Sequence, residues 1–498
     1  MRIYLCRFDT LPAPQTNIIT FSTCTLNIVM SILHSLLFIF FFLIADSLNA
    51  HQGVKYELIH RHDLHPGPLE RLREIAHSDA IRVRAISRKV RLKQGAGRRQ
   101  ARENRYEPAC NNGSRAEHSS GELPINSGAD YGAGQYLVKM RVGSPAQKVV
   151  LIADTGSDLT WSSCRYKCRG ARSCGPTHRR RVFRADRSSS FRTVPCSSTI
   201  CKTDLANLFS LSRCPSPLDP CSYDYRYSDG SATLGVFANE TVTFSLANGR
   251  KARLHDVLVG CSESARGQSF VAADGVMGLG YSNYSLAVKA AAKFGGKFSY
   301  CLVDHLSPKN VSSYLIFGSH KDVNISVVRM RYTELVLGVI NPFYAVNVKG
   351  ISVGDIMLDI PDEVWDLSGV GGAIVDSGTS LTVLTQPAYQ PVMAALRESL
   401  QGFKRLDLDI GPLEYCFNST GFDAAMVPRL VLHFVDGARF EPPVKSYVID
   451  AAPGVKCLGF AAAAWPGASV VGNILQQNHF WEFDIGKSRL GFGTSSCV

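Results

Sequence analysis

Two short motifs in this 498-residue chain could do chemistry. VVLIADTGSDLT at 149–160 and GAIVDSGTSLT at 372–382 each place an aspartate, Asp154 and Asp376, directly after an apolar, strand-like run. Two carboxylates held about 3 Å apart cannot both ionise, so they share one proton and titrate as a unit. The ionised member could then take a proton from a bound water while the protonated member donates to a carbonyl oxygen. Such a pair would hydrolyse an amide without a metal, a cofactor or a covalent intermediate.

The residues that follow each aspartate have three expected supporting roles. A glycine lets the backbone approach the carboxylates closely, because it has no Cβ. One hydroxyl can hydrogen-bond the outer carboxylate oxygen, and another can tie the two loops to each other. Gly156 and Gly378 are the glycines. Ser157 and Thr379 are expected to bond the outer carboxylate oxygens, and Thr155 and Ser377 are expected to tie the loops together.

An internal repeat extends beyond these motifs. A single triplet of Asp, a hydroxyl residue and Gly occurs by chance and is commonly an Asx turn at the end of a strand. Here each triplet is followed, much later, by a second signature of two apolar residues and a glycine: GVMGLG at 275–280 and SVVGNI at 469–474. The repeat predicts two lobes that carry one aspartate each and join near residues 328–332.

The elements that must position the aspartates are mostly short strands. Runs of β-branched and aromatic residues separated by Gly, Pro, Asn and Asp predict an all-β, antiparallel body from residue 121 onward. The clearest helix is expected at 386–400. The expected strands include 135–142, 148–153, 240–244, 344–348, 430–434 and 489–493.

Cysteine usage indicates the compartment. Of the 15 cysteines, twelve follow residue 160, and an even set is typical of six disulfides formed in an oxidising compartment. A zinc cluster is disfavoured because the early members lack the paired spacing of a zinc module, so no metal is expected. A shared lobe suggests one bond, between Cys416 and Cys457. The disulfide candidates are Cys164, Cys168, Cys174, Cys196, Cys201, Cys214, Cys221, Cys261, Cys301, Cys416, Cys457 and Cys497.

An apolar run near the N-terminus agrees with that compartment. ILHSLLFIFFFLI at 32–44 is short for a membrane span and predicts a signal peptide within residues 1–50, with Met30 as an alternative start. An uncleaved signal anchor is the other interpretation of this run. The expected destination is the secretory pathway, ending in the extracellular space or the vacuole.

Residues 51–120 differ in charge from the rest. They carry 15 Lys and Arg against eight Asp and Glu, a net charge of +7, and six of the 13 His. A basic helix is expected at 69–92. The segment is interpreted as a removable pro-segment that covers the carboxylate-centred cleft and weakens its hold in acid. A nucleic-acid-binding arm and a merely solvated helix are the alternatives.

These motifs together resemble those of the pepsin-type aspartic peptidases, and specifically the plant nepenthesin-like branch. The resemblance covers about residues 121–498. It rests on GADYGAGQYLVKMRVGSPAQKVVLIADTGSDLTW at 128–161, on GGAIVDSGTSLTVL at 371–384 and on a Cys-rich insertion at 164–221. KYELIHRHD at 55–63 is similar to the start of the pro-segments of this branch.

The resemblance implies a bilobal all-β fold with few short helices and a cleft between an N-terminal lobe at 121–330 and a C-terminal lobe at 331–498. It also implies a zymogen that becomes an endopeptidase at acid pH and prefers hydrophobic residues near the cut. Asp154 and Asp376 match the family's catalytic pair, and aspartic peptidases are the established example of a shared-proton dyad. Tyr227 matches the flap tyrosine, and Trp161 matches its hydrogen-bond donor. Ser228 departs from the family's flap glycine, where a left-handed φ would disfavour serine.

Other features leave alternatives open. The Arg-rich insertion at 165–192 is either a solvated loop or a docking patch for an anionic polymer, membrane or nucleic acid. The chain is expected to be a monomer. Six sequons are glycosylation candidates in a secreted protein: Asn112, Asn239, Asn283, Asn310, Asn324 and Asn418.

Two rival functions compete with peptidase activity. One is a catalytically silent inhibitor of wall-degrading enzymes on the same fold, although such proteins typically lack a catalytic Asp or an intact flap. The other is a nucleic-acid-binding peptidase homologue, which the basic segments suggest and the signal-like run disfavours.

Overall fold

The computed structural model describes residues 121–127, 135–166, 182–207, 211–214, 216–227, 230–246, 250–267, 270–304, 313–319 and 327–497, together with Leu69, Glu70, Leu72, Arg73, Ala76, Asp79 and Arg82. The signal-like run, most of the basic segment and most of the Arg-rich insertion lie outside these residues, as do Cys168, Cys174, Ser228, Asn112, Asn310 and Asn324. Residues 51–498 form one unit, to which this description is confined.

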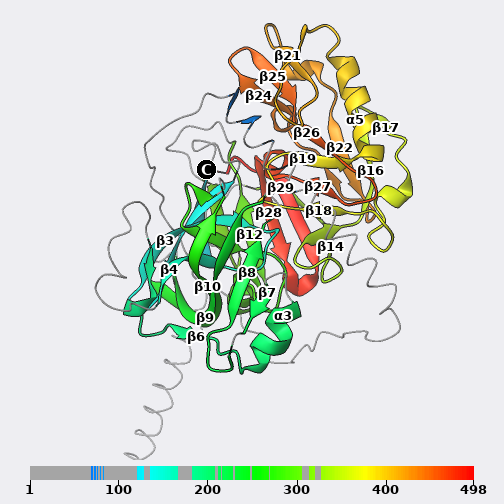
Figure 1. The fold of residues 1–498 in the computed structure, drawn as a ribbon. Coiled ribbons are helices and arrows are strands. Elements are labelled where there is room, and N and C mark those ends of the chain that lie inside the picture. The colour runs from blue at the N-terminus through cyan, green and yellow to red at the C-terminus, as the bar shows by residue number, and fades with distance from the viewer. Residues whose placement is uncertain are drawn as a thin grey trace, which may run out of the picture. The chain divides into compact units, whose positions relative to one another are not determined.

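Strands dominate both halves of this unit, as the residue patterns predict. Figure 1 shows the strands of the first half and those of the second half as two groups, with β28 and β29 near both. In the first half the strands are β1 (Gly121–Ser127), β2 (Tyr136–Val142), β3 (Gln147–Asp154), β4 (Trp161–Arg165), β5 (Phe183–Arg184), β6 (Arg192–Thr193), β7 (Leu211–Arg213), β8 (Ser222–Arg226), β9 (Ala232–Ser245), β10 (Lys251–Arg266), β11 (Gly275–Gly278), β12 (Lys297–Cys301) and β13 (Ser313–Phe317).

The second half has the same character. Its strands are β14 (Val328–Val336), β15 (Tyr344–Val346), β16 (Val348–Val353), β17 (Ile356–Met357), β18 (Ala373–Val375), β19 (Thr382–Thr385), β20 (Arg405–Leu406), β21 (Cys416–Asn418), β22 (Leu430–Phe434), β23 (Arg439–Phe440), β24 (Val448–Ala452), β25 (Val455–Leu458), β26 (Phe460–Ala463), β27 (Ser469–Val471), β28 (His479–Asp484) and β29 (Arg489–Thr494). All six strands expected from the sequence are present, and the lobe junction expected near 328–332 lies within β14.

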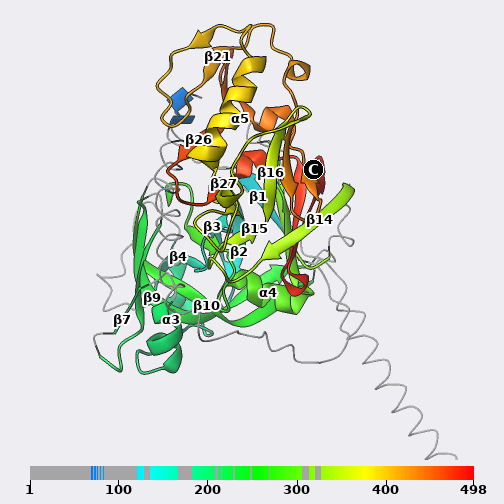
Figure 2. The ribbon, with the colours of Figure 1, turned by 90° about the vertical axis from the view of Figure 1, so that its right-hand side faces the viewer.

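Helices are few and short. α4 (Leu286–Phe294) begins where the Ser285 side chain accepts a hydrogen bond from the Val288 amide and ends at Gly295, whose φ of 100° is left-handed. α5 (Gln386–Ser399) agrees with the helix expected at 386–400 and lies beside β16 in Figure 2. The remaining named helices are α3 (Leu205–Asn207) and α6 (Asn473–Gln476). No helix among the described residues has the length and apolarity needed to cross a membrane.

The internal repeat predicted from the sequence is present in the strand pairing. β11 pairs parallel to β3 and antiparallel to β4, and β27 pairs parallel to β18 and antiparallel to β19. A fourth strand completes each copy, because β10 runs parallel to β4 and β26 runs parallel to β19. Each aspartate motif is therefore the loop between the two outer strands of a three-strand unit, and the later glycine signature is its middle strand.

Sheet pairing also joins the two halves. β28, from the C-terminal end of the chain, pairs with β12 of the first half, and Phe298 stacks on Phe483 with ring centroids 4.8 Å apart. Buried residues of both halves contribute to one hydrophobic cluster that contains these rings. Burial of this much apolar surface fixes the two repeats relative to each other.

Five disulfides lie within the described residues. They join Cys164 to Cys261, Cys196 to Cys214, Cys201 to Cys221, Cys301 to Cys497, and Cys416 to Cys457. The last of these is the bond that a shared lobe suggested. Cys168 and Cys174, the other two of the twelve candidates, lie outside the described residues.

Candidate active site

The two aspartates come together at the ends of equivalent strands. Asp154 ends β3 and Asp376 directly follows β18, and both are buried. The middle strand of each repeat holds the local backbone, because the Leu279 amide donates to the Asp154 carbonyl and the Asp376 amide donates to the Val471 carbonyl. The strand–turn geometry that the sequence predicted therefore delivers both carboxylates to one place.

Each carboxylate has the same set of local donors. Oδ1 of Asp154 accepts from the Gly156 amide at 3.0 Å, and its Oδ2 accepts from the Ser157 hydroxyl at 2.5 Å. Oδ1 of Asp376 accepts from the Gly378 amide at 2.8 Å, and its Oδ2 accepts from the Thr379 hydroxyl at 2.6 Å. Donors of this kind favour the ionised form of a carboxyl group, so they oppose the effect of burial.

The glycines leave room for the opposite carboxylate. A Cβ on Gly156 would lie 2.8 Å from Oδ1 of Asp376, and one on Gly378 would lie 2.1 Å from Oδ1 of Asp154. Both contacts are too short for carbon, so a side chain at either position would push the two loops apart. The close approach expected from the sequence is made to the carboxylate of the other repeat rather than of the same one.

Two hydroxyls tie the loops together, as the sequence predicted. The Thr155 amide donates to the Ser377 hydroxyl oxygen at 3.1 Å, and the Ser377 amide donates to Oγ1 of Thr155 at 2.9 Å. The Ser377 hydroxyl in turn donates to the Ala153 carbonyl. All of these atoms are buried, so each bond satisfies a backbone group that water does not reach.

Two amide side chains that the sequence analysis did not predict hydrogen-bond the backbone of the second aspartate loop. Nδ2 of Asn473 donates to the Ser377 carbonyl at 2.9 Å, and Nε2 of Gln476 donates to the carbonyls of Val471 and Asp376. Both residues belong to α6; Asn473 lies within the second glycine signature, and Gln476 lies two residues after it. Their position in the repeat is the only signal that could have identified them.

The tyrosine and tryptophan expected at the flap are also joined. β8 and β9 form a hairpin, and Tyr227 begins its turn, where its amide donates to the Ser231 carbonyl. Nε1 of Trp161 donates to the Tyr227 hydroxyl at 2.5 Å, and both rings pack edge-on against Phe270. Burial raises the pKa of Tyr227 well above its usual range, so its hydroxyl stays protonated.

An arginine from the basic segment lies between the two carboxylates. Nη2 of Arg82 lies 2.6 Å from Oδ1 of Asp154 and 2.9 Å from Oδ2 of Asp376, while its Nε donates to Oδ2 of Asp376 at 3.0 Å. The side chain of Arg82 is only 10% exposed. Both carboxylates therefore reach one common atom. The sequence reasoning expected a basic segment over the cleft but did not identify this residue.

The rest of the described segment lies on the second half of the chain. Leu72 and Ala76 are buried among apolar residues that include Phe343 and Ile410. Figure 1 draws the described positions of this segment in blue beside β24, and Figure 2 draws them near β26. The described positions of residues 69–82 are helical, which agrees with the helix expected from residue 69.

A third carboxylate from the segment is bound close to the pair. Asp79 accepts hydrogen bonds from the amides of Ser380 and Leu381, at 3.0 and 2.6 Å. Burial raises the pKa of Asp79 to about 7, against the lowering effect of these amides and of Arg82. Burial likewise raises the pKa of Asp376 above its ordinary value, against the opposing charge of Arg82.

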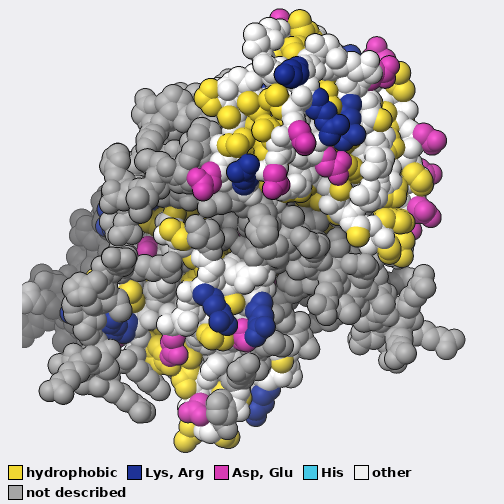
Figure 3. Space-filling view, turned by 45° about the horizontal axis from the view of Figure 1, so that its top comes forward, with side chains coloured by type: hydrophobic (Ala, Val, Ile, Leu, Met, Phe, Trp, Pro, Cys, Tyr) yellow, Lys and Arg dark blue, Asp and Glu magenta, His cyan; other side chains and the backbone are white. Residues whose placement is uncertain are grey.

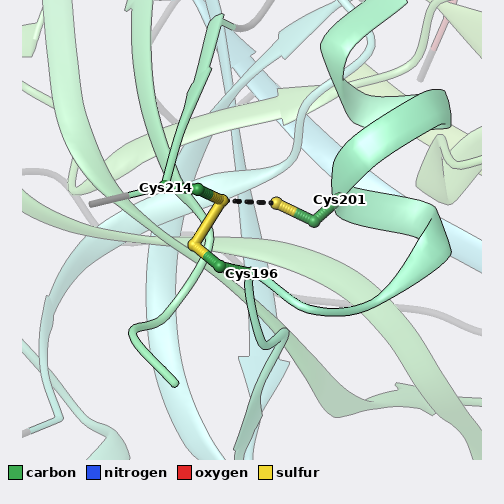
Figure 4. A group of neighbouring side chains, drawn as sticks. All are labelled: Cys196, Cys201 and Cys214. Atoms are coloured by element: carbon green, nitrogen blue, oxygen red, sulfur yellow. Dashed lines mark hydrogen bonds between the residues drawn. A yellow bond between two sulfur atoms is a disulfide. The ribbon is translucent and has the colours of Figure 1, made fainter. Parts of the chain in front are cut away.

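Three neighbouring cysteines have the spacing of a possible metal site but are already bonded. Sulfur atoms of Cys196, Cys201 and Cys214 lie within 4.8 Å of one another. Figure 4 shows the disulfide between Cys196 and Cys214, with the sulfur of Cys201 3.2 Å from that of Cys214. Cys201 is itself bonded to Cys221. Since a metal needs thiolates, this cluster is two adjacent disulfides rather than a metal centre.

The three described sequons differ in exposure. Asn283 and Asn418 are exposed, whereas Asn239 is half-buried within β9. A glycan needs an accessible amide, so the first two are the better candidates for modification.

Two family models match most of this region. The model described as "Xylanase inhibitor N-terminal" matches residues 136–319, and the one described as "Xylanase inhibitor C-terminal" matches residues 343–494. Among solved structures, a basic 7S globulin from soybean has a TM-score of 0.57 at 22% identity, covering 76% of this chain and 97% of that one. Conglutin gamma from lupine seeds has a TM-score of 0.59 at 20% identity, covering 75% and 95%. These structures share the fold.

Curated relatives are more similar in sequence. Aspartyl protease family protein 2 of Arabidopsis thaliana is 35% identical over 380 residues, which cover 75% of this chain and 73% of that protein. Aspartic proteinase nepenthesin-1 of Nepenthes gracilis is 30% identical over 384 residues, covering 76% and 82%. On this similarity and on the repeat that carries the two aspartates, the chain belongs to the pepsin-type aspartic protease family, in its plant nepenthesin-like branch.

Proposed function

We propose that this protein is an aspartic endopeptidase that hydrolyses peptide bonds with a water held between Asp154 and Asp376. The observation that carries the proposal is that both carboxylates, each with its own pair of donors, lie within hydrogen-bond distance of one atom, Nη2 of Arg82. An atom in that position can contact both members of the pair at once. A water molecule there would be placed to lose a proton to one carboxylate as it attacks a carbonyl carbon.

The environment of the two aspartates supports a protonated and an ionised member of the pair. Burial favours the protonated form of Asp376, and two negative charges this close cannot both persist, so the pair holds one proton in the working state. The protonated member donates to the scissile carbonyl oxygen, and the ionised member acts as the base. The loop ties through Thr155 and Ser377 keep the two carboxylates at this separation.

We further propose that the chain is made as a zymogen in which residues 69–82 block the site. The guanidinium of Arg82 takes the place that the attacking water needs, and the apolar face of the helix covers part of the second lobe. A guanidinium stays charged at all relevant pH values, so only the carboxylates can titrate in this contact. Arg82 lowers the pKa of Asp376, hence docking is favoured where the pair is ionised and weakens as pH falls through its pKa.

Peptide substrates and a secretory location complete the proposal. The curated relatives are named as proteases, and five disulfides are typical of an oxidising compartment. Leu72 and Ala76 cover an apolar surface of the second lobe that removal of the segment would expose, which supports a preference for hydrophobic residues near the cut.

The test is digestion of a denatured protein by the recombinant full-length chain at pH 3–4, with and without pepstatin. We expect cleavage after a lag, loss of residues 69–82 from the N-terminus of the active form, and inhibition by pepstatin. The matched control is Asp376→Asn, which keeps the side-chain volume and should show neither digestion nor self-processing. A precursor that is fully active at neutral pH with its basic segment attached would contradict the zymogen.

A non-catalytic inhibitor is the second candidate, because both matching family models are described as xylanase inhibitor domains. The complete pair of aspartates and the intact loop ties argue against it. The same Asp376→Asn variant separates the two functions. An inhibitor of xylanase would act equally well with and without the substitution, whereas peptidase turnover would be lost.

A further inference from the structure

A hollow of about 500 Å³ lies where the beginning of β14 meets the end of β29 and the loop after β23. Its volume is in the range of sites that take a small organic molecule. It shares no residue with the candidate active site. Its apolar lining residues include Phe492 and Pro442, both buried.

The lining of this hollow is strongly basic. Arg329, Arg331, Arg439 and Lys445 line it, with Glu441 as the one acid. Lys445 pairs with Asp304 at 3.3 Å, and Nη1 of Arg331 donates to the Arg439 carbonyl at 2.9 Å. Within the described part of the chain, the guanidinium groups of Arg329 and Arg439 have no acidic partner.

Some basic side chains elsewhere in the described residues have acidic neighbours. On the face drawn in Figure 3, dark blue and magenta side chains lie among each other. On the second lobe Arg397 pairs with Glu414, and Lys456 pairs with Asp450. Unlike these pairs, Arg329 and Arg439 bring positive charge to the hollow without an acidic partner among the described residues, which favours an anionic occupant.

Two residues that line the hollow have an unusual backbone conformation. Asn478 has a φ of 59° and Arg329 has a φ of 49°, both left-handed. Arg329 lies at an irregularity in the pairing of β14 with β29, between Val328 and Arg331, which turns the strand locally. Residues other than glycine adopt this conformation at a cost, and such positions concentrate at binding sites.

We propose that this hollow binds a small organic anion that carries at least two oxyanion groups, carboxylate or phosphate. The guanidinium groups of Arg329 and Arg439 hold the oxyanions, because their planar donors match carboxylate and phosphate oxygens. The apolar side chains of Phe492 and Pro442 contact the carbon skeleton. The site is independent of peptide hydrolysis.

Calorimetric titration of the full-length chain tests the proposal without any proteolytic readout. The probes are trigalacturonic acid for carboxylate, glucose 1,6-bisphosphate for phosphate, and maltotriose as a neutral control. We expect saturable binding of one anionic probe, no binding of maltotriose, and binding that is about tenfold weaker or more in the double variant Arg329→Ala, Arg439→Ala. The tighter probe identifies the oxyanion.

The matched control removes two arginines of the same lobe outside the hollow, Arg397→Ala with Arg405→Ala, and should bind as the unaltered chain does. Equal losses in both double variants would mean a general charge effect and would overturn the site. So would the absence of saturable binding by both anionic probes.

Discussion

Nη2 of Arg82 lies 2.6 Å from Oδ1 of Asp154, although 72 positions separate the two residues in the chain. Arg82→Ala should free the carboxylate pair in the uncleaved precursor. The lost contact is buried and charge-assisted, so docking of the segment should weaken by roughly 3 kcal/mol. The affinity of the precursor for pepstatin should therefore rise by about 100-fold. Binding of pepstatin to the full-length chain at pH 5–6 measures this before any processing.

The control for this variant is Arg73→Ala in the same segment. Arg73 is exposed and donates from its Nε to the Asp409 carbonyl, so its loss removes the same charge without touching the carboxylates. Pepstatin affinity should change little. If both variants bound pepstatin equally well, the net charge of the segment, and not the position of Arg82, would account for the blocking.

The hydroxyl tie between the two loops can be removed with little change of shape. Thr155→Val deletes the acceptor of the Ser377 amide, which is buried, so a loss of about 1–3 kcal/mol in the free energy of unfolding is expected. Activity should fall as well, because the carboxylates are held by this tie. Thermal unfolding of the full-length chain and its peptidase activity after acid treatment are the measurements.

Thr160→Val is the matched control, since Oγ1 of Thr160 is buried without a hydrogen-bond partner among the described residues. The same substitution there removes an unpaired hydroxyl and should leave stability unchanged or slightly higher. Equal destabilisation by both changes would show that the loop tie contributes nothing specific.

The hydrogen bond from Trp161 to Tyr227 is expected to set the position of the flap. Trp161→Phe deletes the Nε1 donor and should reduce kcat/KM by about fivefold, chiefly through KM, because a hydrogen bond is typically worth about 1 kcal/mol and its loss leaves the tyrosine less ordered. Trp365→Phe is the comparison. Nε1 of Trp365 is buried without a partner among the described residues, so the same loss of volume should leave kcat/KM nearly unchanged.

The sequence predicted what is encoded locally. The apolar strand, the aspartate and the glycine of each repeat are neighbours in the chain, so the order of the residues alone was enough to assign the two loops and their supporting hydroxyls. The repeated spacing then implied that the two copies meet. Asn473 and Gln476 were missed because an amide side chain in or next to the glycine signature has no distinctive pattern of its own.

Contacts between distant residues were beyond local reasoning. The basic segment holds 15 Lys and Arg, and nothing in its composition singles out Arg82. Which cation reaches the pair depends on the phase of the helix and on where Leu72 and Ala76 pack. For the same reason the pairing of Cys301 with Cys497, 196 positions apart, could not be predicted.

Asp79 gives the docked segment a pH dependence opposite to that of Arg82. Burial raises the pKa of Asp79 to about 7 in the docked state, whereas an unfolded or released carboxyl titrates near 3.8. The docked state therefore holds the proton more tightly between these values. The contribution of Asp79 to docking is fully present below about pH 3.8 and is lost as pH rises through about 7.

Asp79→Asn should remove this dependence, because the amide is neutral at every pH and its oxygen can still accept from the Leu381 amide. Hydrogen exchange of residues 69–82 in the full-length chain, followed from pH 4 to pH 8, is the measurement. In the unaltered chain, protection should carry a component that falls with rising pH, on the order of a few kcal/mol in total. In Asp79→Asn only the opposite trend, from the pairing of Arg82 with the aspartates, should remain.

The control is Glu70→Gln, an exposed carboxyl of the same segment, which should behave as the unaltered chain does. If Asp79→Asn and the unaltered chain gave the same pH profile, Asp79 would be ionised when docked, and the buried neutral carboxyl would be the wrong description.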